Sequence, residues 1–191
     1  HRATLRVSAA GITVSTDFTW QVSAPGVTRY VRIEALSEVA GNPWTSAAEF
    51  VLLDANGQPL NRGGWRVSTD SEELSGENGA AANAVDGNPA TIWHTRWQGA
   101  SPAHPHWLVV DLGAPSEVSG LRYLPRQDAS ANGTIDAYRV FLSADGVNWG
   151  VPVAQGNFAE LGAVKAEKAI YFRNVARARP ASQSSTYGGV A

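Results

Sequence analysis

Hydrophobic and polar residues alternate in short runs along most of this chain, and turn-forming residues separate the runs. The clearest runs are RYVRIEAL at 29–36, HWLVVDLG at 106–113 and AYRVFLS at 137–143. Successive side chains on a β-strand point to opposite faces, so a period of two predicts half-buried strands. No long stretch has the period of an amphipathic helix. The pattern therefore predicts an all-β protein built as an antiparallel β-sandwich.

The turns and the ends of the chain divide it into parts. Segments 48–57 and 141–146 end in NG and DG, dipeptides that accept positive φ and close hairpins. Residues 1–26 are expected to form a flanking β-hairpin, the tail of an upstream domain. The alternation stops in 174–191, which are expected to be a linker or the start of a further module. The organised domain is predicted at 27–173.

Composition narrows the classes of function. The net charge is −2 and Lys and Arg form no cluster, so nucleic acid is not an expected partner. No apolar stretch is long enough to span a bilayer, so membrane insertion is not expected. The 191 residues include no cysteine, which excludes disulfides, zinc–thiolate sites and cysteine nucleophiles. Seven tryptophans are many for this length, and their flat faces suit the C–H face of a sugar ring.

A cluster of oxygen ligands lies in the segment NAVDGNPAT. The side chains of Asp86, Asn88 and Thr91 surround Gly87 in a tight loop, an arrangement that suits calcium. The same letters are also typical of a plain Asx-turn, and the spacing leaves both interpretations open. A carboxylate from elsewhere would favour the metal, and Glu49 in SAAEF is the candidate.

Polar residues that could bind a sugar gather around the segment TIWHTRW. His94 lies between two tryptophans, Trp97 follows it, and Glu77, Arg126 and Asn132 lie in neighbouring predicted turns. A neutral sugar is recognised by paired donors and acceptors above an aromatic platform, and this set can supply both. The alternative is a buried core histidine, a surface ion pair and a turn asparagine. Spacing alone does not decide between them.

Catalytic arrangements are weaker. His94, His104 and His106 could form a histidine metal site, but no HExxH helix accompanies them. Glu72 and Glu73 could pair as glycosidase carboxylates, yet adjacent residues on a strand point to opposite faces. No GxSxG motif is present. The sequence therefore predicts a protein that is not an enzyme.

Several motifs, read in order, carry a resemblance to a known family. The segments are DSEELSGENGAAANAVDGNPATIWHTRW, PHWLVVDLG, GLRYLPRQD, FLSADGVNWG and PVAQGNF, spread over about 65–172. They resemble the discoidin-like carbohydrate-binding modules of family 32, also called F5/8 or coagulation-factor C-type domains, such as those attached to bacterial sialidases and galactose oxidase. The resemblance implies a discoidin-type, galactose-binding-like jelly-roll β-sandwich with a structural calcium, which binds galactose-type sugars without catalysis.

One departure from the family concerns strand order. Segments similar to RYVRIEAL and NPWTSAAEF come last in the family, whereas here they occupy 29–50. This predicts a circularly permuted sandwich in which 55–64 joins the former ends. The rival explanation is a tandem array in which 27–57 completes an upstream copy. That arrangement would leave an exposed sheet edge in this chain, so we favour permutation.

The resemblance also implies site residues. Its calcium site matches the side chains of Glu49, Asp86, Asn88 and Thr91 and the backbone carbonyls of Ala48 and Asn83. Its galactose or N-acetylgalactosamine site matches Glu77, His94, Trp97, Arg126 and Asn132. Trp44 is expected either to extend the rim of this site or to serve packing.

The flanks suggest a larger parent. Residues 1–24 resemble the closing strands of an immunoglobulin-like repeat, and 174–191 resemble the opening of another discoidin or fucose-lectin module. We therefore expect a secreted or cell-surface protein of several modules, which this domain holds at a galactose-containing glycan. The alternative is a structural or adhesive β-sandwich that binds protein or lipid and has no functional sugar pocket.

Overall fold

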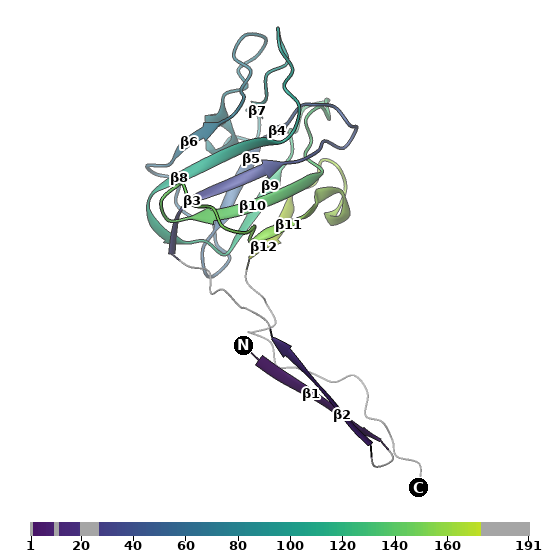
Figure 1. The fold of residues 1–191 in the computed structure, drawn as a ribbon. Coiled ribbons are helices and arrows are strands. Elements are labelled where there is room, and N and C mark those ends of the chain that lie inside the picture. Colours follow the sequence, from purple (N-terminus) through teal and green to yellow (C-terminus); the bar gives the residue numbers. More distant parts are fainter. Residues whose placement is uncertain (1, 10–11, 20–26, 173–191) are drawn as a thin grey trace. The chain divides into compact units, whose positions relative to one another are not determined.

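The computed structural model describes residues 2–9, 12–19 and 27–172, which contain strands and short 3₁₀ turns but no α-helix (Figure 1). In chain order the elements are β1 (Arg2–Ala9), β2 (Ile12–Thr19), β3 (Val27–Ala35), β4 (Ser46–Ala47), β5 (Glu49–Leu53), β6 (Arg66–Thr69), η1 (Ala81–Val85), β7 (Trp93–His94), β8 (His106–Glu117), β9 (Gly120–Leu124), β10 (Ala137–Ser143), β11 (Ala154–Asn157), η2 (Phe158–Leu161) and β12 (Lys168–Tyr171). None of the described helical turns has the length and apolar character needed to cross a lipid bilayer.

Two antiparallel sheets form the domain, as the alternating runs predicted. One has five strands in the order β11-β10-β3-β8-β6, and the other has three in the order β12-β9-β5. A short ladder of β4 and β7 lies apart from both sheets and joins two loops. In β8 the residues from His106 to Leu112 alternate between buried and half-buried, so one face of the strand supplies core residues.

The core lies between the two sheets. The five-stranded sheet contributes Val31, Ile33, Leu108, Val110 and Val140, and the three-stranded sheet contributes Phe50, Leu52, Leu121, Tyr123 and Ile170. These residues form one buried cluster, so burial of apolar surface holds the sheets face to face. The prediction of an all-β sandwich is confirmed.

The early segment 27–53 is part of this same sandwich. β3 is the middle strand of the five-stranded sheet and pairs with β10 on one side and β8 on the other. β5 pairs with β9 in the second sheet. β3, the first strand of the sandwich in chain order, is therefore the central strand of its sheet. That the strand order arose by permutation of the family's order stays a prediction.

The β1–β2 hairpin belongs to a different compact unit from the sandwich. Residues 25–173 form one compact unit. β1 and β2 pair antiparallel from Arg2 with Thr19 to Ala9 with Ile12. The predicted origin of 1–26 in an upstream domain stays a prediction, and the prediction for 174–191 lies outside the described residues.

Candidate carbohydrate site and cation loop

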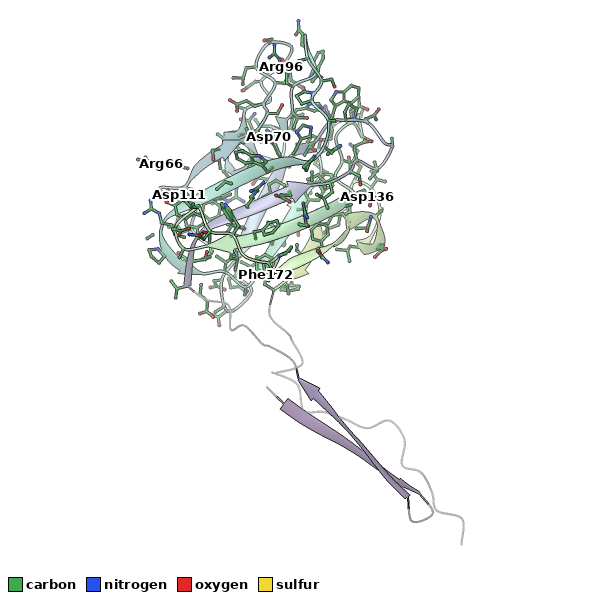
Figure 2. The ribbon with its side chains drawn as sticks, viewed as in Figure 1. Arg66, Asp70, Arg96, Asp111, Asp136 and Phe172 are labelled. Carbon is green, nitrogen blue, oxygen red and sulfur yellow. The ribbon has the colours of Figure 1, made fainter. Side chains whose placement is uncertain are left out.

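The loops that surround β4 and β7 enclose a hollow of about 250 Å³. We call it the His94 pocket. Its lining consists of Trp44, Glu77, His94, Trp97, Arg126, Ser130 and Asn132. All five residues predicted for a sugar site therefore lie in one hollow, and Trp44 lines the same hollow. Arg96, labelled in Figure 2, marks this end of the sandwich.

β7 places His94 at the base of the pocket. The strand pairs Ala47 with Trp93 and Ser46 with His94. Trp93 is fully buried in the core and donates its indole N–H to the carbonyl of Ser71 at 3.0 Å. Neighbouring residues on a strand face opposite ways, so the burial of Trp93 turns His94 toward the pocket. This arrangement explains the histidine between tryptophans in TIWHTRW.

The surroundings of His94 determine its protonation. Its Nδ1 lies 2.6 Å from the carbonyl oxygen of Thr95, which can only accept, so Nδ1 carries the hydrogen. The side chain is 3% exposed, and burial lowers its pKa from the ordinary value, although the bond to Thr95 acts in the opposite direction. His94 is therefore neutral at pH 7 and presents Nε2 as an acceptor.

Trp97 supplies an aromatic face on the rim. It is 42% exposed, and its indole Nε1 donates to Glu77 Oε1 at 3.0 Å. A Cβ at position 76 would lie 2.5 Å from the Trp97 ring, so Gly76 allows the indole to lie against the neighbouring turn. Trp44, whose ring centre is 6.5 Å from that of His94, completes the aromatic lining.

Glu73 fixes the two loops that carry Trp97 and Glu77. Its Oε1 accepts from the backbone N–H groups of Ser75 and Gly76, and its Oε2 accepts from those of Trp97 and Gln98, at 2.7–2.9 Å. These backbone bonds lower the pKa of Glu73 to about 2. Residue spacing does not predict this role of Glu73, because bonds to backbone groups produce no pattern in the sequence.

Arg126 and Asn132 form the opposite wall. Arg126 is 7% exposed and makes a bidentate ion pair with Asp128, with Nε to Oδ1 at 2.8 Å and Nη2 to Oδ2 at 2.5 Å. Its Nη1 donates to the carbonyl of Asn132 at 3.3 Å. A guanidinium has five N–H donors, so two remain for a ligand. The pairing lowers the pKa of Asp128, which stays ionised.

A second group of predicted residues meets at the loop after η1. Thr91 Oγ1 donates to Asp86 Oδ2 at 2.7 Å, and the backbone N–H of Asn88 donates to Asp86 Oδ1 at 2.7 Å. The N–H of Gly87 donates to Glu49 Oε1 at 2.7 Å, which brings a residue from β5 to this loop. We call Glu49 and 83–91 the cation loop. Asn83 braces it through side-chain bonds to the carbonyls of Asn78 and Ile92.

The oxygen atoms of the cation loop suit calcium, but Arg62 already contacts one of them. Glu49 is 5% exposed, and burial raises its pKa; Arg62 opposes this shift and Asp86 adds to it. A buried carboxylate beside amide, hydroxyl and carbonyl oxygens suits a hard cation. Among the described residues, no group of three or more His, Asp or Glu side chains is arranged so that it could hold a metal ion, so neutral oxygens would have to complete the set. Arg62 Nη1 already lies 2.7 Å from Glu49 Oε2.

The other two histidines of the described residues, His104 and His106, lie beside the pocket lining. His104 Nε2 is 3.0 Å from Thr45 Oγ1. His106 is fully buried, with Nδ1 2.7 Å from Asp70 and Nε2 2.8 Å from the carbonyl of Pro43 (Asp70 is labelled in Figure 2). Burial lowers the pKa of His106, but the bonds to Asp70 and Pro43 outweigh it, and the net direction is upward. Both nitrogens face acceptors, which favours the doubly protonated form of the His106 imidazole.

We expect NMR titration of the imidazole protons to place the pKa of His106 above 6.5 and those of His94 and His104 below it. Because the His106 pKa is higher in the folded state, its contribution to stability is fully present below pH 6.5 and is lost as pH rises through the folded pKa. Asp70→Asn should lower this pKa and remove the dependence. A wild-type His106 that titrates below 6.5 would contradict the assignment.

The protein is an antiparallel β-sandwich with a polar and aromatic pocket at one end. These features define its class as a β-sandwich module whose pocket is formed by loops. Residues 67–186 match the family described as F5/8 type C domain, and the chain belongs to that family. The discoidin-like jelly-roll fold implied by the sequence motifs is thereby confirmed.

Several enzymes contain a segment that is similar in sequence to this chain. The chain is 42% identical over 138 residues to a sialidase of Micromonospora viridifaciens, which covers 71% of this chain and 20% of that protein. It is 42% identical over 115 residues to a galactose oxidase of Gibberella zeae (58% and 16%) and 33% identical over 101 residues to a lacto-N-biosidase of Bifidobacterium bifidum (48% and 9%). The chain thus spans a fifth or less of the length of these relatives.

Proposed function

We propose that this domain is a carbohydrate-binding module that recognises galactose-type residues, galactose or N-acetylgalactosamine, in the His94 pocket. One observation carries the proposal: an imidazole acceptor, spare guanidinium donors and an exposed indole face line a single hollow. That combination matches a ring with hydroxyls on one side and C–H groups on the other. The names of the relatives, which include a galactose oxidase and a sialidase, support carbohydrate as the ligand class.

The chemistry of each group suggests its role. The axial 4-hydroxyl of galactose would donate to His94 Nε2, and that hydroxyl or its neighbour would accept from Arg126. Asn132, whose side chain has no hydrogen bond among the described residues, would bond a further hydroxyl. The Trp97 indole would stack on the apolar face of the ring. Glu77 disfavours acidic sugars, since their carboxylate would meet a like charge.

We propose that binding proceeds without catalysis. Asp128 is held by Arg126 and Glu73 accepts four backbone bonds, so neither is available as an acid or base. Glu77 is the one carboxylate among the residues that line the pocket, and no second lining carboxylate stands opposite it for paired acid–base work. His94 uses Nδ1 to bond Thr95. The module would instead hold a larger secreted or cell-surface protein near its glycan. Neighbouring modules would then raise a weak single-site affinity through effective concentration.

We also propose that calcium binds the cation loop. Side-chain oxygens of Glu49, Asp86, Asn88 and Thr91, with the carbonyls of Ala48 and Asn83, would hold it. A bound calcium would supply positive charge to the paired carboxylates and fasten β5 to the loop. The chain's own contribution is to bring Glu49 to Gly87 and to orient Asp86 through Thr91.

Calorimetric titration of the folded, calcium-supplied protein with galactose, with glucose as the control sugar, tests the proposed function. We expect saturable binding of galactose and at least tenfold weaker binding of glucose, whose equatorial 4-hydroxyl would leave buried polar groups unpaired at about 1–3 kcal/mol each. Absence of heat with galactose, N-acetylgalactosamine and glucose would overturn the proposal. It would favour a structural or adhesive role for the module.

We expect Glu73→Gln to weaken galactose binding by at least tenfold and to lower the melting temperature by roughly 5–10 °C. An amide at this position would direct N–H donors at backbone N–H groups and release the loops that hold Trp97 and Glu77. Since the pKa of Glu73 is lowered to about 2, the wild-type contribution is present above pH 4.5 and is lost as pH falls toward 2. Glu72→Gln is the matched control, because within the described part of the chain Glu72 accepts from a single backbone group, Ala81 N–H. Equal effects of the two substitutions would argue against the role of Glu73.

A further inference from the structure

A second, larger hollow adjoins the His94 pocket and shares Glu77 with it. Its volume is about 800 Å³, compared with about 250 Å³ for the pocket. We call it the Ile92 groove, and its further lining includes Asn78, Pro89, Ile92, Leu124, Gln127 and Asp128. The smaller hollow has the size of a single sugar ring, whereas the larger lies within the range of roughly 300–1,000 Å³ typical of small-molecule sites.

Hydrogen bonds fix both walls of the Ile92 groove. On one side, Thr91 Oγ1 donates to Asp86 Oδ2 at 2.7 Å and lies 2.8 Å from the carbonyl of Asn88. On the other side, Gln127 Nε2 donates to the carbonyls of Pro125 and Lys165 at 2.7 and 3.1 Å. A groove with fixed walls loses little conformational entropy when a ligand binds.

The surface chemistry of the groove is that of a neutral sugar site. Pro89, Ile92 and Leu124 give it apolar surface. Among the described residues, no hydrogen bond uses the side-chain amide of Asn78 or the Oε1 of Gln127, so both can bond hydroxyls. The charge of Asp128 is paired with that of Arg126, which leaves Glu77 as the carboxylate that would repel an acidic sugar.

We propose that the Ile92 groove is a second sugar subsite and that the ligand is a neutral oligosaccharide with its terminal galactose in the His94 pocket. The next residue enters the groove past Glu77, packs its C–H groups on Leu124 and Ile92, and bonds Asn78 and Gln127. This inference rests on the proposed galactose function of the pocket. It extends that proposal to a ligand of at least two sugar residues, the second of which lies against a wall formed by the cation loop.

Parallel titrations with galactose and lactose, in which galactose is linked to a second neutral hexose, test the subsite. We expect wild-type protein to bind lactose about tenfold more tightly than galactose, which corresponds to one or two added hydrogen bonds and the apolar contact. Asn78→Ala and Gln127→Ala should each reduce this ratio to about two and leave galactose affinity unchanged. Gln155→Ala, at an exposed position of β11, is the matched control and should keep the ratio near ten.

The possible results separate the two proposals. If galactose binds but lactose binds no more tightly, the subsite is wrong and the galactose pocket stands. If Asn78→Ala, whose side chain has no internal bond to lose, weakens galactose and lactose equally, the subsite is also wrong. If neither sugar binds to folded protein, the pocket and the subsite fail together. Melting temperatures within about 2 °C of wild type for Asn78→Ala would show that the comparison concerns binding rather than folding.

Discussion

Replacing His94 with alanine should weaken galactose binding by about 30- to 150-fold. The substitution removes the acceptor at the base of the pocket and leaves the hydrogen of the buried galactose 4-hydroxyl without a partner, at a cost of about 2–3 kcal/mol. Nδ1 is bonded to Thr95, so the lost group toward the ligand is Nε2 alone. Calorimetric titration of both proteins measures the effect directly.

Two further variants isolate the role of Nε2. His94→Gln can place a carboxamide oxygen near the position of Nε2, so part of the affinity should return relative to alanine. His104→Ala removes an imidazole that bonds Thr45 and does not line the pocket, and it should leave affinity within about twofold of wild type. If His94→Ala retained wild-type affinity, the ligand would not lie over this histidine and the proposed site would be wrong.

The strands that sequence could predict are those with one buried face. β3 and β8 alternate because each presents one side to the core, and both were expected from their period of two. β11, with the sequence AQGN, has no apolar residue longer than alanine and gave no such signal. β4 and β7 are two residues each, too short for any period. Their pairing depends on contacts between loops distant in sequence.

Five of the residues that line the pocket were predicted for a sugar site, but Ser130 was not, and neither were the contacts that hold the pocket together. Glu77, His94, Trp97, Arg126 and Asn132 followed from residue chemistry and family motifs, and the structure brings them into one hollow. Glu72 and Glu73 were treated as neighbours on a strand. They instead lie in an irregular segment, where each accepts hydrogen bonds from backbone N–H groups.

The contact of Arg62 with Glu49 was also beyond the reach of the sequence. Arg62 lies in the segment 55–64, which we expected only to join two strands. Thirteen residues separate it from Glu49, and no pattern specifies that its guanidinium meets a buried carboxylate. This contact changes the expected loss of stability on calcium removal, because the Arg62 guanidinium stays beside Glu49 when the metal leaves.

Removing calcium with a chelator should therefore lower the melting temperature of the wild-type domain by about 5–10 °C. A ligand present at about 100 times its dissociation constant stabilises the folded state by about 2.7 kcal/mol, and a domain of this size shifts by about 2–4 °C per kcal/mol. Without calcium, the ion pair of Arg62 and Glu49 still compensates the buried charge in part. Differential scanning calorimetry with and without chelator measures the shift.

The Arg62→Gln variant should be the most sensitive to calcium removal. In chelator its buried Glu49 would have neither cation, so its melting temperature should fall below that of chelated wild type; with calcium the two proteins should differ little. Arg66→Gln is the matched control, since Arg66 lies exposed on β6 (Figure 2) and has no bond to Glu49. If chelation leaves both the wild type and Arg62→Gln unchanged, calcium does not bind the cation loop. If chelation lowers the melting temperature of the two proteins equally, calcium binds the loop without competition from Arg62. A guanidinium that shares Glu49 with the metal would change the stability lost on calcium removal.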